Sequence, residues 1–269
     1  MQKVDTACFE IITRCPLVCV HCSACAAPQR ADTVTPAQFS VALGRLGRLQ
    51  EVYLSGGEPF EHPKLGEFIA LAQEWTDRVV LYSSGVVNSD KPAPISHETV
   101  REVSRLGVHR VDVSLYADNP EQHERVTATP GSWAAAVESI RRFHSASVKV
   151  GLHHAPILPH AYVLKGIAHL AKQLKVTRVH ILALASQGRG ALLDSSLPQE
   201  WLDEARILSV GRPDLDLVLS SRIRQQLSVN QSTERDSWNA IFVDHRGRIY
   251  PGEGKRQLIM RSASSLFDS

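Results

Sequence analysis

Three cysteines near the start of the chain have the spacing of iron–sulfur cluster ligands. Cys15, Cys19 and Cys22 are separated by three and then two residues. Three thiolates can ligate three irons of a 4Fe–4S cluster, whereas an electron-transfer cluster usually has all four irons ligated by protein. The fourth iron is then open to a substrate or cofactor. The count of three therefore points to chemistry at this iron.

Zinc is the alternative metal for these thiols. A structural zinc site takes four ligands, and the nearby side chains that could complete it are His21, Cys25 and Cys8. The glycine-rich segment described next, and its place after the second predicted strand, argue against zinc.

This glycine-rich segment, residues 54–60, reads Leu-Ser-Gly-Gly-Glu-Pro-Phe. Gly56 and Gly57 let the backbone approach a ligand without side-chain clashes, and the Glu58 carboxylate can accept a hydrogen bond from an amine. Alone, the two glycines would predict no more than a strand–helix turn. In this order along the chain, the cysteines and the "GGEP" sequence resemble the two motifs of the radical S-adenosylmethionine (radical SAM) family.

The resemblance implies two cofactors: one 4Fe–4S cluster on the three cysteines, and S-adenosylmethionine on its open iron. The amine of S-adenosylmethionine would be held at the "GGEP" turn, and its ribose and carboxylate in later turns. The implied cofactor-binding residues are Gly56, Gly57, Glu58, Ser83, Ser84, Ser114, Arg125 and Gln187. From the residues alone, Ser83-Ser84 predicts only a turn, Arg125 a surface ion pair, and Gln187 a loop shaped by its glycines.

The resemblance also implies the family's chemistry. One electron from an external donor of the flavodoxin or ferredoxin type cleaves S-adenosylmethionine to a 5′-deoxyadenosyl radical, and this radical takes a hydrogen atom from the substrate. Cys25 is the nearest thiol that could return a hydrogen atom to a substrate radical. The alternative is that Cys25 is a bystander beside the cluster loop.

Alternating strands and helices must position these residues. The apolar stretches predict six strands, at 7–13, 52–54, 79–82, 110–115, 148–153 and 176–183. Thr35, Pro36 and Gln38 predict a capped start for the first helix. Strands that are apolar throughout and joined by helices predict an α/β fold with a parallel sheet. The resemblance covers roughly residues 7–190 and implies a partial, TIM-like (β/α)6 barrel with its chemistry at the carboxyl ends of the strands.

Residues 191–269 predict a small C-terminal α+β extension. A helix at 197–208, a strand at 215–219 and a hairpin at 240–250 resemble the "SPASM" or "twitch" extensions of the family, in which cysteines flank the hairpin. No cysteine follows Cys25, so composition excludes a second cluster ligated by cysteines of this region. We expect two units, residues 1–190 and 191–269, with the hairpin covering the open side of the barrel. The predicted substrate contacts are Trp238, Tyr250 and Glu253.

Composition limits the partners of the chain. Its 269 residues are 43% hydrophobic and 22% charged, with a formal net charge of +2, which suffices for one large α/β domain. No basic stripe predicts a nucleic-acid surface, and no apolar run approaches the length that spans a membrane. The five cysteines suit metal binding in a reducing compartment better than a disulfide framework. We expect a cytoplasmic protein with no nucleic-acid or membrane partner.

The position of the first predicted strand bears on the class of substrate. The first strand is predicted almost at residue 1, so we expect no leader-peptide-binding domain before it. We therefore expect a small-molecule substrate, derived from a sugar, nucleoside or amino acid, in specialised metabolism such as natural product biosynthesis. The alternative is a ribosomally made peptide delivered by a partner. A third hypothesis, a non-catalytic metal-binding regulator, would need the cysteines but neither Glu58 nor Ser114.

Overall fold

The computed structural model describes residues 4–211, 214–227, 239–251 and 265–267. Its main feature is a sheet of nine strands. Listed in the order in which they lie side by side, the strands are β11 (Ile249–Pro251), β10 (Ala240–Val243), β1 (Thr6–Ile12), β2 (Glu51–Gly56), β3 (Val79–Ser83), β6 (Arg110–Ser114), β7 (Val150–His154), β8 (Arg178–Ile181) and β9 (Asp216–Leu219). All neighbouring pairs are parallel except β10 with β11.

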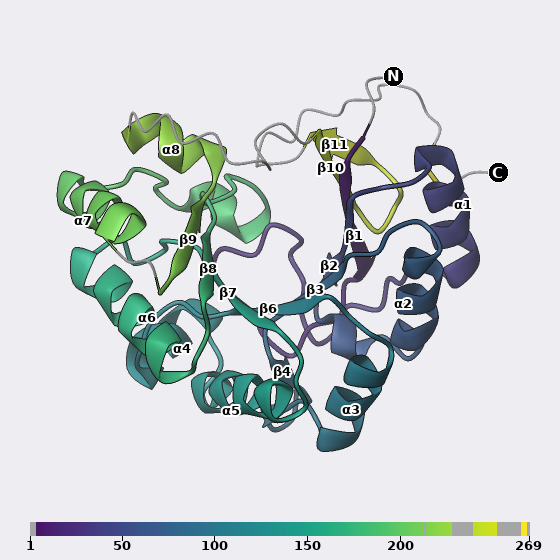
Figure 1. Ribbon diagram of the computed structural model, residues 1–269, viewed down its shortest axis with the longest axis horizontal. Helices are drawn as coiled ribbons and strands as arrows, with labels where there is room; N and C mark the ends of the chain where they lie inside the picture. Colours follow the sequence, from purple (N-terminus) through teal and green to yellow (C-terminus); the bar gives the residue numbers. More distant parts are fainter. Residues whose placement is uncertain (1–3, 212–213, 228–238, 252–264, 268–269) are drawn as a thin grey trace.

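Helices surround the outer side of this curved sheet (Figure 1). They are α1 (Pro36–Leu46), α2 (Leu65–Gln73), α3 (His97–Arg105), α4 (Pro120–Thr127), α5 (Ser132–Ser145), α6 (Ala161–Gln173), α7 (Gln199–Gly211) and α8 (Ser221–Leu227). Two short 3-10 helices, η1 (Pro59–Glu61) and η2 (Gly188–Leu192), follow β2 and β8, and a small hairpin of β4 (Val86–Val87) and β5 (Ala93–Pro94) follows β3. None of the helices described is long and apolar enough to cross a bilayer.

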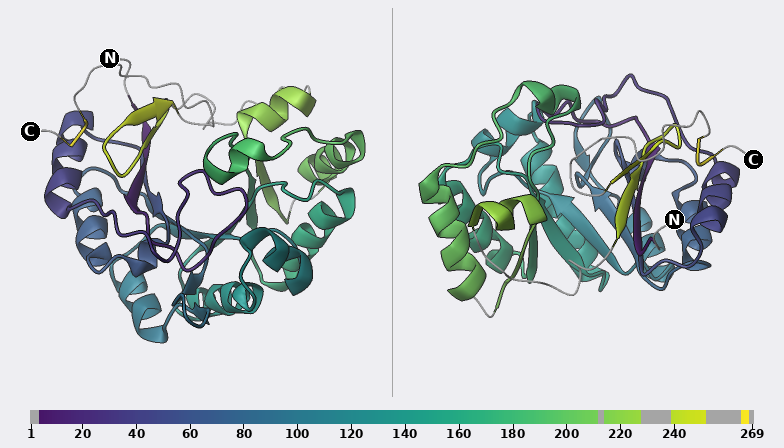
Figure 2. Two further views of the ribbon diagram at one scale, coloured as in Figure 1. Left: turned by 180° about the vertical axis from the view of Figure 1, so that it is seen from behind. Right: turned by 90° about the horizontal axis from the view of Figure 1, so that it is seen from above.

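The predicted α/β fold with a parallel sheet is confirmed. The Thr35 side chain accepts from the Gln38 N–H and the Gln38 side chain accepts from the Thr35 N–H, so α1 begins with the predicted capping box. The sheet remains open, with β9 and β11 as its edges, and Figure 2 shows the opening from two further sides. An open, curved, parallel sheet covered by helices on one side is a partial barrel.

The number of strands in the barrel differs from the prediction. The structure adds β9 next to β8 and β10 next to β1, so that eight parallel strands line the interior where six were expected. The predicted hairpin at 240–250 is present as β10 and β11, and β10 lengthens the barrel sheet itself. Described strands on both sides of residue 190 belong to one sheet, and the division into two units there stays a prediction.

Inside the barrel, two residues of β6, Arg110 and Asp112, form a buried ion pair. The Arg110 guanidinium donates to the Asp112 carboxylate from Nε at 2.6 Å and from Nη2 at 3.0 Å. A Cβ atom at Gly151, on the neighbouring strand, would collide with Asp112 Oδ1. Gly151 therefore makes room for this pair.

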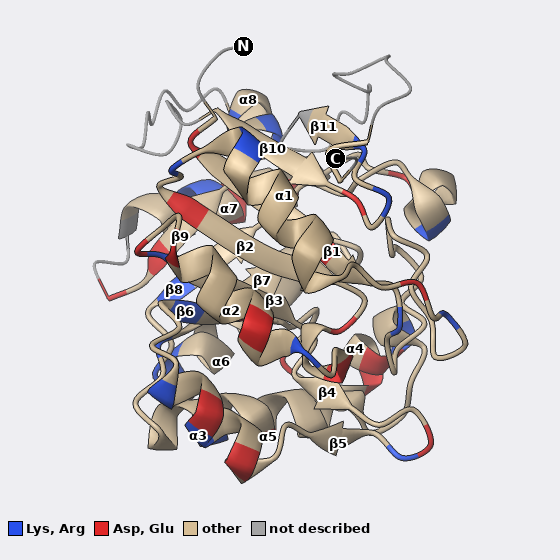
Figure 3. Ribbon diagram, turned by 90° about the vertical axis from the view of Figure 1, so that its right-hand side faces the viewer, with Lys and Arg blue, Asp and Glu red and all other residues tan. Residues whose placement is uncertain are grey.

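Charged residues of both signs are distributed over the elements of the fold. In the ribbon of Figure 3, Lys and Arg are interspersed with Asp and Glu.

Candidate active site

One cavity of about 470 Å³ lies inside the barrel and reaches the carboxyl ends of its strands. Its lining contains eight of the predicted site residues: Cys15, Cys19, Cys22, Gly56, Gly57, Ser83, Ser84 and Ser114. These residues come from the loops or ends of β1, β2, β3 and β6. The barrel therefore brings together side chains that are a hundred residues apart in the sequence, as the rule for parallel barrels predicts.

Four predicted residues lie outside the described lining of this cavity: Cys25, Glu58, Arg125 and Gln187. Arg125 is exposed on α4, and the Gln187 Oε1 atom has no hydrogen-bond partner among the described residues. The predicted roles of Cys25 as a hydrogen donor, and of Arg125 and Gln187 in cofactor binding, stay predictions.

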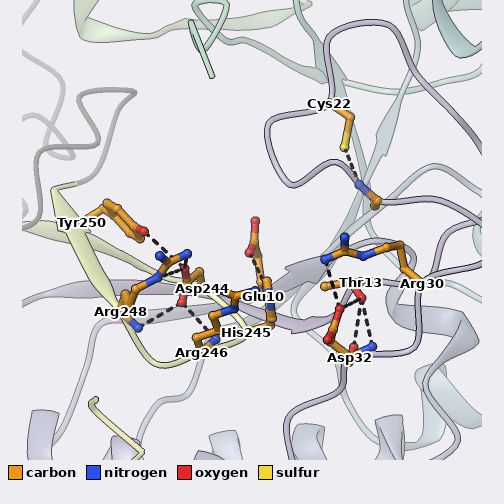
Figure 4. Close-up of polar contacts among 11 residues, drawn as sticks. Glu10, Thr13, Cys22, Arg30, Asp32, Asp244, His245, Arg246, Arg248 and Tyr250 are labelled. Atoms are coloured by element: carbon orange, nitrogen blue, oxygen red, sulfur yellow. Dashed lines mark hydrogen bonds and ion pairs between the residues drawn. The ribbon is translucent and has the colours of Figure 1, made fainter. Parts of the chain in front are cut away.

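The cysteine loop after β1 is held in shape by its own backbone and by one arginine. The Cys22 N–H donates to the Cys19 carbonyl at 3.2 Å, and the Cys25 N–H donates to the Cys22 carbonyl at 3.3 Å. The Cys22 sulfur accepts from the Ala26 N–H at 3.4 Å (Figure 4). Arg189 donates to the Cys19 carbonyl at 2.7 Å and to the Ala26 carbonyl at 2.9 Å.

This arginine belongs to the Gln-Gly-Arg-Gly turn after β8. The Arg189 N–H donates to the Cys22 carbonyl at 3.0 Å. A Cβ at Gly188, where φ is +56°, would lie 2.5 Å from the Cys22 carbonyl oxygen, and one at Gly190 would lie 2.9 Å from that of His21. The glycines thus let the turn pack directly on the cysteine loop. The turn supports the loop in this structure.

Three thiols on one loop match the donor set of a 4Fe–4S cluster with one open iron. Among the described residues, no three of His, Cys, Asp and Glu gather around a point where one metal ion could bind. A cubane takes each thiolate on a different iron, so its ligand sulfurs stand apart from one another. Burial, and then the neighbouring Cys22 thiolate, raises the pKa of Cys19 to about 12, and burial likewise raises the pKa of Cys15. Positive charge from bound iron offsets this cost of forming thiolates.

Gly56 and Gly57 bring the "GGEP" turn against the cysteine loop. The Gly57 N–H donates to the Ile12 carbonyl at 2.6 Å, and the Glu58 N–H donates to the Arg14 carbonyl at 2.8 Å. A Cβ at Gly56 would collide with the Ile12 carbonyl oxygen, and one at Gly57 with that of Arg14. Gly56 also has a φ of +133°, which disfavours any other residue. The two glycines are therefore needed for the close packing of the "GGEP" turn on the backbone of residues 12–14, and both also line the cavity.

Glu58 joins the "GGEP" turn to the turn after β3. Its fully buried carboxylate accepts from the Ser83 hydroxyl at 2.8 Å, from the Ser84 N–H at 2.7 Å and from the Ser84 hydroxyl at 2.6 Å. Burial raises its pKa to about 7, although these hydrogen bonds lower it. Glu58 therefore positions two serines that line the cavity, and its predicted contact with the amine of S-adenosylmethionine stays a prediction.

Two acidic residues and a histidine near the hairpin were not predicted from the sequence. Glu10, on β1, is buried and lines the cavity, and its Oε2 lies 3.6 Å from Nδ1 of His245 in the hairpin turn (Figure 4). Asp244, also buried, accepts from the Arg246 and Arg248 N–H groups, both at 3.0 Å, and from Arg248 Nε at 2.7 Å. The only sequence signal for Glu10 is its spacing of two from Cys8, which also lines the cavity.

Of the substrate contacts predicted in the C-terminal extension, Tyr250 is described. It is buried, and its hydroxyl donates to Asp244 at 3.2 Å. Trp238 and Glu253 lie outside the described residues. The hairpin reaches the cavity instead through the strand β10, whose residues Ala240, Ile241 and Phe242 line it.

Comparison with known proteins identifies the family. The family model of the Radical SAM superfamily matches residues 9–177, a range that contains all three cluster cysteines and the "GGEP" turn. Two curated relatives are an AdoMet-dependent heme synthase of Methanosarcina barkeri, 26% identical over 72% of this chain and 54% of the relative, and a PqqA peptide cyclase of Gluconobacter oxydans, 27% identical over 67% of this chain and 49% of the relative. The chain thus spans about half the length of these relatives.

A solved structure agrees on the fold. Streptococcus suis SuiB bound to its precursor peptide SuiA superposes with a TM-score of 0.74, covering 99% of this chain and 63% of SuiB, at 10% sequence identity. Radical SAM enzymes use a 4Fe–4S cluster and S-adenosylmethionine, and the assignment of the cysteine loop and the neighbouring turns to these cofactors stays a prediction. The chain belongs to the Radical SAM superfamily.

Proposed function

We propose that this chain modifies a ribosomally made peptide by radical chemistry. The observation that carries the proposal is the combination of a peptide cyclase among its relatives with a fold that matches, over 99% of this chain, an enzyme bound to its precursor peptide. The comparisons thus favour the peptide over the small molecule that the sequence led us to expect first. When bound, the cluster and S-adenosylmethionine supply a 5′-deoxyadenosyl radical that takes a hydrogen atom from the substrate.

The residues of the chain bind, orient and shield the reactants. The cysteine loop holds the cluster, and Ser114 offers a hydroxyl to the polar groups of S-adenosylmethionine from one side of the cavity. The Ser83 and Ser84 hydroxyls donate to Glu58 and can accept a hydrogen bond from the cofactor. The apolar residues of β9 and β10 enclose the opposite side, where Val218, Leu219 and Phe242 line the cavity. Enclosure keeps water and competing hydrogen donors away from a radical. The electron comes from an external donor of the flavodoxin or ferredoxin type.

The test uses anaerobically reconstituted protein with S-adenosylmethionine and a strong reductant. Synthetic peptides from the short reading frames that neighbour its gene are added one at a time. We expect one of them to accelerate the formation of 5′-deoxyadenosine and to change in mass, and we expect the variant Cys19→Ala to do neither. If none of the peptides does so while a small-molecule metabolite does, the peptide proposal fails.

A small-molecule substrate is the second candidate. The heme synthase among the relatives has a name that designates a small-molecule product, and its match to this chain covers slightly more residues than that of the peptide cyclase. The metabolite arm of the same experiment tests this candidate.

A further inference from the structure

Four rings from four strands touch one another in the wall of the cavity. Tyr53 of β2 lies 4.6 Å from Tyr82 of β3, measured between ring centroids. Tyr82 lies 4.0 Å from His153 of β7, and His153 lies 5.2 Å from His180 of β8. All four side chains line the cavity. We call these four residues the aromatic wall.

Next to the aromatic wall lies the buried ion pair of Arg110 and Asp112, with Asp112 of β6 in register with Tyr82 of β3. These two residues are outside the described lining of the cavity, and they bind each other through two hydrogen bonds. The two charges therefore neutralise each other, and the Arg110 guanidinium also lies 4.0 Å from the buried Glu51 carboxylate. The Tyr53 hydroxyl already donates to Glu51, so what the wall offers to a ligand is the faces of its rings and the Nε2 atom of His153.

His153 has an unused polar atom in this wall. Its side chain is 6% exposed, and its Nε2 atom has no hydrogen-bond partner among the described residues. Burial lowers the pKa of His153 to about 4, although Asp112 raises it. The ring is therefore neutral at pH 7, with one nitrogen that donates and one that accepts. A buried nitrogen of this kind favours a ligand that supplies its missing hydrogen bond.

The adjacent histidine provides an internal comparison. His154 is also buried, with 1% of its surface exposed, and its Nε2 likewise has no partner among the residues that the structure describes. Its Nδ1 lies 3.0 Å from the Leu115 carbonyl oxygen, and it is outside the lining of the cavity. Neighbouring residues of a strand point to opposite faces. Of the two, only His153 lines the cavity.

We propose that the aromatic wall binds an aromatic side chain of the substrate that carries a neutral hydrogen-bonding group, such as a phenol hydroxyl, with His153 as its hydrogen-bond partner. The proposal rests on the proposed function, because it assigns the class of side chain that is placed in the barrel. Ring faces stack on or pack edge-to-face against a further ring. A charged group would lose its hydration there without gaining a counter-ion from the paired Arg110 and Asp112.

The test is calorimetric titration of reconstituted protein, in the presence of S-adenosylmethionine and without reductant, with p-cresol and with toluene. The two probes differ only in the hydroxyl. We expect p-cresol to bind about tenfold more tightly than toluene, because one hydrogen bond to a buried group is gained. The preference should disappear in His153→Phe, which keeps the ring, and persist in the matched control His154→Phe.

A second variant, His153→Gln, restores a polar side-chain nitrogen and should recover part of the preference. It also keeps the test decisive if His153→Phe does not fold. Equal binding of both probes to the wild-type protein, binding of neither, or an unchanged preference in the folded His153 variants would overturn the proposal. Since no reductant or peptide is present, failure here is distinguishable from failure of the proposed function.

Discussion

At the scale of single residues, three thiols determine whether the chain holds its cluster. We expect the reconstituted protein to bind about four irons per chain, and Cys15→Ala, Cys19→Ala or Cys22→Ala to abolish this binding because each removes one ligand. Cys8→Ala and Cys25→Ala should retain it. Iron and sulfide analysis with anaerobic absorbance spectra measures the result. About eight irons per chain, or stoichiometric zinc in cleanly purified protein, would contradict the single cluster.

Glu58 gives a prediction about pH. Its pKa rises on folding from 4.5 to about 7, so the folded state binds this proton more tightly than the unfolded chain does. The stability that depends on this proton is fully present below about pH 4.5 and is lost as the pH rises to about 7. Glu58→Gln cannot titrate, although its amide loses some of the carboxylate's hydrogen bonds. We expect the melting temperature of the metal-free wild-type protein to fall, relative to that of Glu58→Gln, between pH 4.5 and 7; parallel curves would exclude this titration.

Glu58 also bears on the cofactor. Replacing it with alanine removes the acceptor for Ser83 and Ser84, so both cavity-lining hydroxyls lose their positions. We expect Glu58→Ala to weaken the binding of S-adenosylmethionine by about tenfold or more, the effect of losing about 1.4 kcal/mol, while the iron content is unchanged. Equilibrium dialysis measures the affinity. Unchanged affinity would show that the serines do not depend on Glu58.

The residues that could be predicted are those whose spacing along the chain is itself a motif. The three cysteines of the cluster motif and the two glycines of the "GGEP" turn have such a spacing. His153 did not, because its role depends on Tyr82, which is 71 positions away in the sequence and lies beside it only after the strands pair. Neighbouring residues of a strand point to opposite faces, so at most one of His153 and His154 can face the cavity, and only His153 belongs to its described lining.

At the scale of elements, the turn that carries Arg189 supports the cysteine loop. Arg189→Ala removes hydrogen bonds to the Cys19 and Ala26 carbonyls, and the loss of charged donors destabilises the loop by on the order of 2–3 kcal/mol. We expect faster loss of iron to a chelator, followed by absorbance, although Arg189 is not a ligand. Gln187→Ala, in the same turn, is the matched control and should behave as wild type. Equal rates for Arg189→Ala and wild type would show that the loop holds its shape unaided.

The elements themselves were largely predictable, and their partners were not. Continuous apolar stretches predicted the central strands, and the Thr35 capping box predicted the start of α1. The pairing of β10 with β1 joins Phe9 to Val243 across most of the chain. Such a contact depends on the closure of the whole barrel, which hydrophobic periodicity within one segment does not encode. The sequence therefore predicted that residues 240–250 form a hairpin, but it did not predict that β10 of this hairpin pairs with β1.

At the scale of the whole molecule, the pairing of β1 with β10 decides whether the chain folds as one unit or two. β1 carries the cysteine loop and lies between β2 and β10. Val243, on β10, is fully buried and pairs with Phe9 of β1. If the two parts form one cooperative unit, a cavity made in β10 must lower the stability of strands on the far side of β1 as well.

Val243→Ala tests this cooperativity. Removing a buried side chain of this size destabilises by about 2–3 kcal/mol. We expect native-state hydrogen exchange of the amides of β3 to report the same loss, since these amides would exchange only through global unfolding. The exposed residue Val210, on α7 and 75% accessible, gives the control Val210→Ala, with a change within about 0.5 kcal/mol. If exchange in β3 is unchanged while that in β10 accelerates, residues 191–269 open independently, and the division at residue 190 that the sequence suggests is a real boundary of stability.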